Sequence, residues 1–217
     1  MKVVFFGDSV TEGCFELFDV DGGFDTVRDP ENVYHNKLKK LWDEKYIDKS
    51  LEVINSGISG DNVNGAIKRL EKDVLNHNPD CVVICFGLND VCSGKDNLDN
   101  YINTLDNIFA QIQNKNIRVI FMTPNMMNTY VHEDTLESAK EAAKVTSSMQ
   151  NDGVFDLYID SVKSLCKDKD IEVVDAYAKW KEMHAEGIDT TKLLSNLINH
   201  PTREMHDLFA NMLIEVL

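Results

Sequence analysis

Cationic side chains are scarce in this 217-residue chain. It has 22 lysines and arginines against 37 aspartates and glutamates, which gives a formal net charge of −15. Nucleic acids and anionic membranes are bound through clustered cations, so this balance argues against both as partners. An acidic surface mainly favours solubility, and we infer no substrate from it.

Long apolar segments are also missing. No stretch approaches the roughly 20 apolar residues that a membrane-spanning helix needs. The apolar start, KVVFF at 2–6, runs directly into Gly-Asp-Ser. Such a short run ending in a polar turn is typical of a strand and not of a secretion signal. We therefore expect a cytoplasmic protein that has no membrane partner.

The cysteines are too few and too irregularly spaced to form a disulfide or metal-binding framework. The five cysteines include no CxxC pair and no Cys/His pair with ligand spacing, so we expect no cysteine-based metal site. Three lie in or beside apolar, strand-like segments. Their odd number favours reduced thiols, as in a cytoplasm.

Internal repeats, low-complexity tracts and linkers are absent, and the length suits a single domain over 1–217. Continuous Val/Ile/Phe runs predict strands that are covered on both faces, at 2–6, 52–55, 81–87, 118–124 and 171–176. Helically spaced apolar residues lie between them, most clearly over 205–216. This alternation predicts an α/β fold with a parallel sheet. The polar, helix-prone stretch at about 125–160 predicts a helical insertion. We expect it to shape the mouth of a pocket at the sheet edge, because it leaves the sheet at the carboxyl end of a strand.

Four polar turns predict a functional site. GDSVTEG (7–13), NSGISGDN (55–62) and GLND (87–90) each follow a predicted strand, and NLINHPT (196–202) precedes the last helix. Ligands bind beyond the carboxyl ends of parallel strands, so we expect these turns to meet at one edge of the sheet.

The residue types in these turns suit acyl transfer. Ser9 is a weak nucleophile until a base activates it, and His200 is the candidate base. A tetrahedral intermediate needs donors aimed at its oxyanion. The Ser9 N–H, the Gly60 N–H and the Asn89 side-chain amide can supply them, and glycine allows close approach because it has no Cβ.

These four turns resemble the blocks of the SGNH (GDSL) hydrolase superfamily, in the family's order and over essentially the whole chain. The resemblance implies a three-layer α/β/α sandwich with a flavodoxin-like five-stranded parallel sheet. It also implies hydrolysis of carboxylic esters, often acetyl or other short acyl esters, without a cofactor.

One position departs from the family pattern. The family usually places an Asp three residues before the histidine, sometimes four, but position 197 is Leu and position 196 is Asn. The third member of such a triad orients the imidazole and stabilises its cation. Asn196, a backbone carbonyl or a distant carboxylate such as Asp189 remain as replacements, and we predict Asn196.

Plainer roles also compete for these residues. Asp8 can contact substrate or His200, but we expect it to hold the turn through bonds to the backbone. Gly57 and Gly60 can both be simple turn glycines, and we prefer Gly60 for the oxyanion hole because it matches the block of the family that the turns resemble. His206 rivals His200, although we expect it to pack or cap in the last helix. Cys14 and Cys92 are alternative nucleophiles, and we expect surface positions for the other histidines: His35, His77, His132 and His184.

The sequence thus predicts a serine esterase whose partner is a small-molecule ester, with a short acyl group on a carbohydrate or similar polyol as the first candidate substrate. A lipase-like or thioesterase-like enzyme or an acyltransferase with the same residues is an alternative. A binding protein on a degraded hydrolase scaffold is another, supported by the missing Asp.

Overall fold

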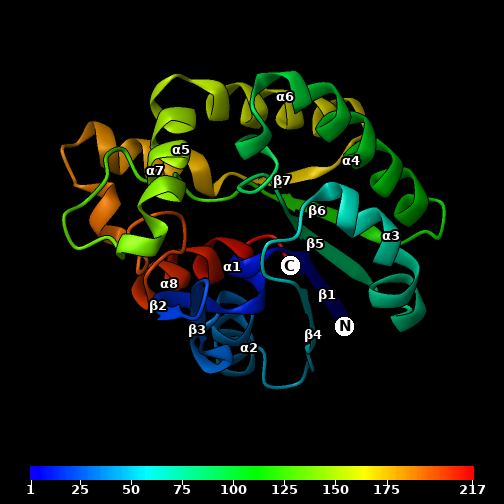
Figure 1. Cartoon of the computed structure of the whole chain (residues 1–217). Coiled ribbons are helices and arrows are strands. Elements are labelled where there is room, and N and C mark those ends of the chain that lie inside the picture. Colours follow the sequence, from blue (N-terminus) through cyan, green and yellow to red (C-terminus); the bar gives the residue numbers. More distant parts are fainter.

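The computed structural model describes residues 1–217, and a parallel sheet lies at its centre (Figure 1). Its strand order is β4-β1-β5-β6-β7, and every neighbouring pair is parallel. The strands are β1 (Lys2–Gly7), β4 (Glu52–Gly57), β5 (Cys81–Cys85), β6 (Arg118–Met122) and β7 (Glu172–Val174). The predicted α/β fold with a five-stranded parallel sheet is confirmed.

Helices cover both faces of this sheet (Figure 1). On one face lie α2 (Tyr34–Lys45) and α8 (Arg203–Leu213), which pack against each other. On the other face lie α3 (Val63–Asp73), α4 (Leu98–Gln113) and α6 (Val154–Asp168). The remaining helices are α1 (Ser9–Glu12), α5 (Lys140–Asn151) and α7 (Ala176–Ala185), with short 3₁₀ turns η1 (Pro30–Asn32), η2 (Leu75–His77), η3 (Val91–Ser93), η4 (Lys95–Asn97), η5 (Glu137–Ala139) and η6 (Thr190–Leu193).

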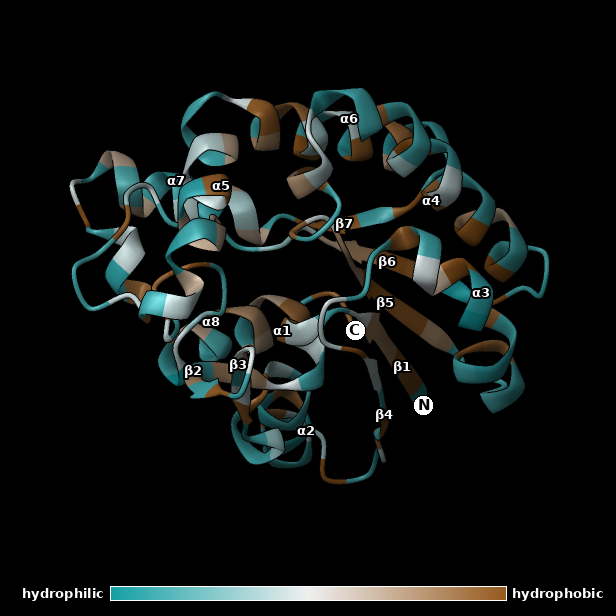
Figure 2. Ribbon diagram, in the orientation of Figure 1, coloured by the Kyte–Doolittle hydropathy of each residue, from teal (hydrophilic) through white to brown (hydrophobic).

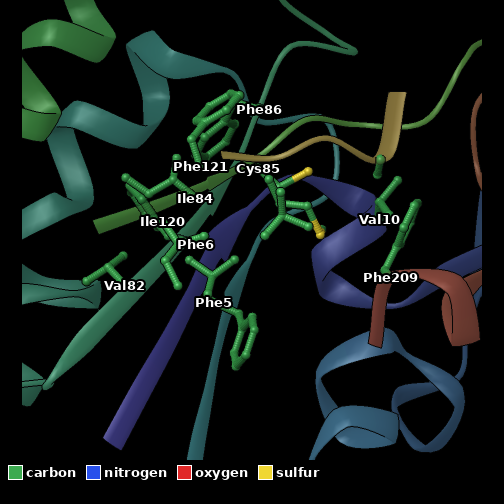
Figure 3. Close-up of a cluster of buried hydrophobic side chains, with 14 of the residues drawn as sticks. Phe5, Phe6, Val10, Val82, Ile84, Cys85, Phe86, Ile120, Phe121 and Phe209 are labelled. Carbon is green, nitrogen blue, oxygen red and sulfur yellow. The ribbon is translucent and has the colours of Figure 1, made fainter. Parts of the chain in front are cut away.

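The central strands are apolar along their whole length because both of their faces are covered. Val3 to Phe6 of β1 have no exposed surface, and every residue of β5 is buried. Figure 3 shows Phe5, Phe6 and Phe121 among the side chains of this core. In Figure 2 the central strands β5 and β6 are mostly brown, whereas the surrounding helices alternate between teal and brown. The polar turns at the edge of the sheet are therefore attached to buried, well-packed strands.

A second, two-stranded antiparallel sheet was not predicted. It consists of β2 (Cys14–Val20) and β3 (Gly23–Arg28), which are joined at Asp21-Gly22. Gly22 has φ +86°, the conformation that favours glycine in tight hairpin turns. The Asp-Gly dipeptide is the signal that could have revealed this hairpin.

The stretch over 125–160 contains η5, α5 and the first part of α6, which returns the chain from β6 to β7. Asn128 anchors its irregular first part, because its amide donates to the Tyr130 and Ala143 carbonyls at 2.9 Å each. None of the helices has the length and apolar character required to cross a bilayer.

Candidate active site

Ser9 lies on the turn between β1 and α1, where it is the first helical residue. Asp8 caps the helix, since its Oδ1 accepts a hydrogen bond from the Val10 N–H at 3.0 Å. Gly7 permits this sharp turn, because a Cβ there would lie 2.1 Å from Thr11 Oγ1. Asp8 thus has the turn-holding geometry expected of it, and the Ser9 side chain is not needed to cap the helix.

His200 contacts Ser9 directly. Its Nε2 lies 2.9 Å from Ser9 Oγ, and its Nδ1 lies 2.9 Å from the carbonyl oxygen of Phe15. A carbonyl can only accept, so Nδ1 carries the proton and Nε2 accepts from the serine hydroxyl. Burial lowers the pKa of His200 to about 4, and the bond to Phe15 only partly offsets this. The imidazole is therefore a neutral base at ordinary pH.

The carbonyl that holds His200 is made available by an irregularity in the hairpin. The pairing of β2 with β3 shifts register between Cys14 and Leu17, so Phe15 has no Cα partner across the ladder. Such bulges re-aim backbone groups. The Arg203 guanidinium lies over the Phe15 ring, 4.4 Å from its centroid, and pairs with Glu16. These contacts fix the strand whose carbonyl orients the imidazole.

The prediction that Asn196 orients the imidazole is wrong. Its Oδ1 accepts hydrogen bonds from the N–H groups of Ile198, Asn199 and His200 at 2.9–3.0 Å, and its Nδ2 donates to Asn199 Oδ1. The side-chain oxygen is therefore fully used in holding its own turn, as short Asn side chains often are. The backbone-carbonyl alternative has the observed geometry, whereas the Asp189 carboxylate instead accepts from the Tyr130 hydroxyl at 2.7 Å.

Three free hydrogen-bond donors lie near the serine. Gly60 has φ +76°, and its N–H has no partner within the chain. Asn89 donates one side-chain N–H to the Asp61 carbonyl at 2.8 Å, which leaves its second N–H available. The Ser9 N–H, at the first position of α1, has no intrahelical acceptor.

One cavity of about 360 Å³ unites these groups, since Ser9, Gly60, Asn89, Asn196 and His200 all line it. Its walls come from two further segments: the hairpin, which the sequence did not assign to the site, and α5, which lies in the stretch over 125–160. The hairpin contributes Leu17, Phe24, Asp25 and Thr26, and α5 contributes Ala142, Val145 and Thr146. These walls are mostly apolar, while the floor around Ser9 is polar.

Two other histidines are buried beside this region. The surface position predicted for His35 is wrong, because only 1% of it is exposed and its Nε2 lies 3.1 Å from the Thr11 carbonyl. His206 packs in the last helix as predicted, stacking on the Tyr34 ring and accepting from the Tyr34 N–H through Nδ1. His184 is exposed, and His77 and His132 are half-buried.

The cysteine alternatives lack an activated thiol. Cys92 lines the cavity, but its thiol donates to the Leu88 carbonyl and desolvation raises its pKa. Burial raises the pKa of Cys14 to about 11. Thiolates are the nucleophilic form, so neither cysteine matches the Ser9–His200 pair. No group of three or more His, Cys, Asp or Glu side chains is placed to hold a metal ion.

Comparison with known proteins defines the class. The sequence profile of the GDSL-like Lipase/Acylhydrolase family matches residues 5–208, and the chain belongs to this family. The resemblance noted from the four turns is thereby confirmed.

Individual relatives are more distant. The chain is 30% identical over 132 residues to an acetylxylan esterase of Geobacillus stearothermophilus, a match that covers 57% of this chain and only 59% of that relative. A solved acetylxylan esterase structure from the same organism has a TM-score of 0.73 at 24% identity, over 99% of this chain and 92% of the other. A lipase/acylhydrolase from Enterococcus faecalis has a TM-score of 0.71 at 23% identity, over 99% and 94%. The two solved structures share the fold.

Proposed function

We propose that this chain hydrolyses carboxylic esters through an acyl-enzyme on Ser9. The observation that carries the proposal is the 2.9 Å contact between Ser9 Oγ and His200 Nε2 in a cavity that Gly60 and Asn89 also line. Membership of a lipase/acylhydrolase family supports it. Solved structures of the Geobacillus relative include two catalytic mutants, one with a serine and one with a histidine replaced by alanine, which also supports a serine–histidine pair.

The reaction proceeds in two halves. His200 Nε2 takes the hydroxyl proton as Ser9 Oγ bonds to the ester carbonyl carbon, and the Ser9 N–H, the Gly60 N–H and the Asn89 amide stabilise the oxyanion. The intermediate expels the alcohol, which takes the proton from His200. Water, deprotonated by His200, then attacks the acyl-enzyme, and the carboxylic acid leaves as Ser9 regains its proton.

The Phe15 carbonyl takes the place of the usual carboxylate in this scheme. It accepts the Nδ1 proton at 2.9 Å and so keeps Nε2 unprotonated and facing Ser9. It carries only a partial charge, so the imidazolium gains less stabilisation than a carboxylate would provide. The missing Asp therefore does not imply a degraded, non-catalytic site.

For the substrate, we propose an acetyl or other short acyl ester of a carbohydrate or similar small polyol. The name of the Geobacillus relative supports this class, as do the modest cavity and its polar floor. The apolar side chains of Leu17, Phe24 and Val145 favour a second candidate, a lipase-like preference for longer acyl chains. An acyltransferase with the same site differs only in the acceptor.

A panel of p-nitrophenyl acetate, butyrate and octanoate, with acetylated xylo-oligosaccharides alongside, tests the proposal. We expect kcat/KM to be highest for acetate and acetate to be released from the oligosaccharides. A maximum at octanoate would favour the lipase-like candidate. Added alcohols that divert the acyl group from water would favour the acyltransferase, and no hydrolysis of any ester by folded protein would contradict the proposal.

The pH profile tests the role of His200. Because burial lowers its pKa to about 4, the neutral base persists well below the usual histidine range. We expect kcat/KM for phenyl acetate, followed by acetate release, to stay level down to about pH 5 and to fall below it. Circular dichroism at each pH checks that the fold is intact. An acidic limb centred near pH 6.5 would contradict this prediction.

A further inference from the structure

The loop that carries Gly60 lies directly on the helix that carries Ser9. The Ile58 N–H donates to the Gly7 carbonyl at 3.1 Å. A Cβ at Gly57 would lie 2.2 Å from the Glu12 backbone nitrogen and 2.5 Å from the Thr11 carbonyl carbon. Gly57 is therefore required for close approach and is more than a turn glycine.

Glu12, one turn after Ser9, bonds to this loop with its side chain. Its Oε2 accepts from the Ser59 N–H, and its Oε1 accepts from Arg28 Nε at 2.7 Å. One carboxylate thus joins α1, the loop before Gly60 and the hairpin that forms a cavity wall. The Glu12 side chain is only 25% exposed, so solvent screens these bonds less than it would on an open surface.

The Gly60 N–H is consequently held from both sides. Ser59 is tied to Glu12 on the preceding side, and on the following side the Asp61 carbonyl accepts from Asn89 Nδ2 at 2.8 Å. Gly60 itself has no atoms within 4 Å of where its Cβ would be. The Asp61 N–H closes the turn over Ser59 and Gly60 by donating to the Ile58 carbonyl at 3.1 Å, and the two anchors fix how this turn is placed relative to α1 and Asn89.

We propose that Glu12 is a positioning residue that aims the Gly60 N–H at the oxyanion, an inference that rests on the proposed function. Oxyanion donors contribute most when they are already oriented before the charge develops. Glu12 achieves this through the Ser59 N–H and does not itself touch the substrate.

The role requires two acceptor oxygens. The Ser59 N–H and Arg28 Nε face different oxygens of the same carboxylate. A glutamine has a single oxygen, so its NH₂ group would have to face one of these two donors. Removing the arginine donor should therefore allow a glutamine to serve Ser59 again.

This requirement defines the experiment. The variants are Glu12→Ala, Glu12→Gln, Arg28→Met and the double variant Glu12→Gln with Arg28→Met, and the exposed Glu31→Gln is the matched control. We expect kcat for p-nitrophenyl acetate to fall about 10- to 100-fold in Glu12→Ala with KM nearly unchanged, since loss of one whole donor costs about 100- to 1000-fold. Glu12→Gln should also fall, whereas the double variant should match Arg28→Met.

A second readout separates positioning from general structure. A phosphonate ester that labels Ser9 places an oxygen in the oxyanion site without turnover, so its labelling rate should fall in parallel with kcat while Tm stays unchanged. Wild-type kcat and labelling in folded Glu12→Ala, or an effect on KM alone, would overturn the proposal. If Glu12→Ala does not fold, failure of the double variant to recover to the Arg28→Met level would overturn it. A wild type that neither hydrolyses esters nor is labelled would overturn the proposed function, and the role of Glu12 with it.

Discussion

Ser9→Ala should lower kcat for p-nitrophenyl acetate by about 10,000-fold or more, since it removes the atom that forms the acyl-enzyme. The fold should survive, because Asp8 and not Ser9 caps α1 and the Ser9 side chain bonds only to His200. Initial rates on acetate and butyrate esters, with Tm for each variant, measure the effect.

His200→Gln should cause a loss of the same order, and the double variant Ser9→Ala with His200→Gln should be little worse than either. Nucleophile and base act as one unit, so their effects do not add. The exposed Ser93→Ala and His184→Gln are the matched controls and should retain wild-type rates. Ester hydrolysis that persists in Ser9→Ala would point to another nucleophile, with Cys92 in the same cavity as the first candidate.

Asp8→Asn should make the protein more stable at pH 8 than the wild type, although it should gain little at pH 4. Burial raises the pKa of Asp8 to about 7, with a contribution from the nearby Asp90 carboxyl. Burial likewise raises the pKa of Asp90 to about 7. Both carboxyls have an oxygen, Oδ2, without a hydrogen-bond partner, so ionisation in the folded state is not compensated.

The sign of this pH dependence of stability follows from the number of protons that the folded and unfolded states bind. Between about pH 4 and 7 the folded protein keeps the Asp8 proton that the unfolded chain releases, so the free energy of unfolding falls as pH rises through this window. The fall is about 1.4 kcal/mol per pH unit for one group. Asn cannot ionise and can still accept from the Val10 N–H. The contribution of position 8 to the free energy of unfolding should therefore no longer change with pH.

Urea unfolding at pH 4, 6 and 8 measures the difference. We expect the stability of Asp8→Asn relative to wild type to increase by as much as about 4 kcal/mol from pH 4 to pH 8. Exposed Asp48→Asn is the control and should show no such pH dependence. An equal difference at all three pH values would show that Asp8 ionises normally in the folded state.

How far the sequence leads can be judged from particular elements. The central strands are recognisable because strands covered on both faces are continuously apolar, and CVVIC at 81–85 is buried throughout. Ser9 and Asn89 are recognisable because polar turns after parallel strands gather at one edge, whereas Gly60 and His200 were assigned with the help of the resemblance to the family's blocks. The structure places all four around one cavity.

The hairpin escaped prediction for a different reason. Phe18, Val20 and Phe24 are more than 40% exposed. The apolar residues of the hairpin therefore do not alternate in the way that marks a strand with one buried face. Only the Asp-Gly turn signalled it. The stretch over 125–160 was expected to shape the mouth of the pocket, but its sequence did not show which residues of α5 would line it, because they are ordinary helix residues until the fold places them at the cavity.

The sequence by itself determined the layered α/β architecture, the order of the four turns and the side chains that can carry out acyl transfer. These features depend on residue type and on the spacing of apolar residues, which can be read directly from the sequence. Only the tertiary structure decided what orients His200. The partner is the backbone carbonyl of Phe15. Because every residue has such a carbonyl, the residue type at position 15 does not reveal this role. Asn196 looked suitable by spacing, but its oxygen is occupied by the backbone of its own turn. The orienting partner of His200 was decided by contacts between residues far apart in the sequence. These include the bulge in the hairpin and the stacking of Arg203 on Phe15.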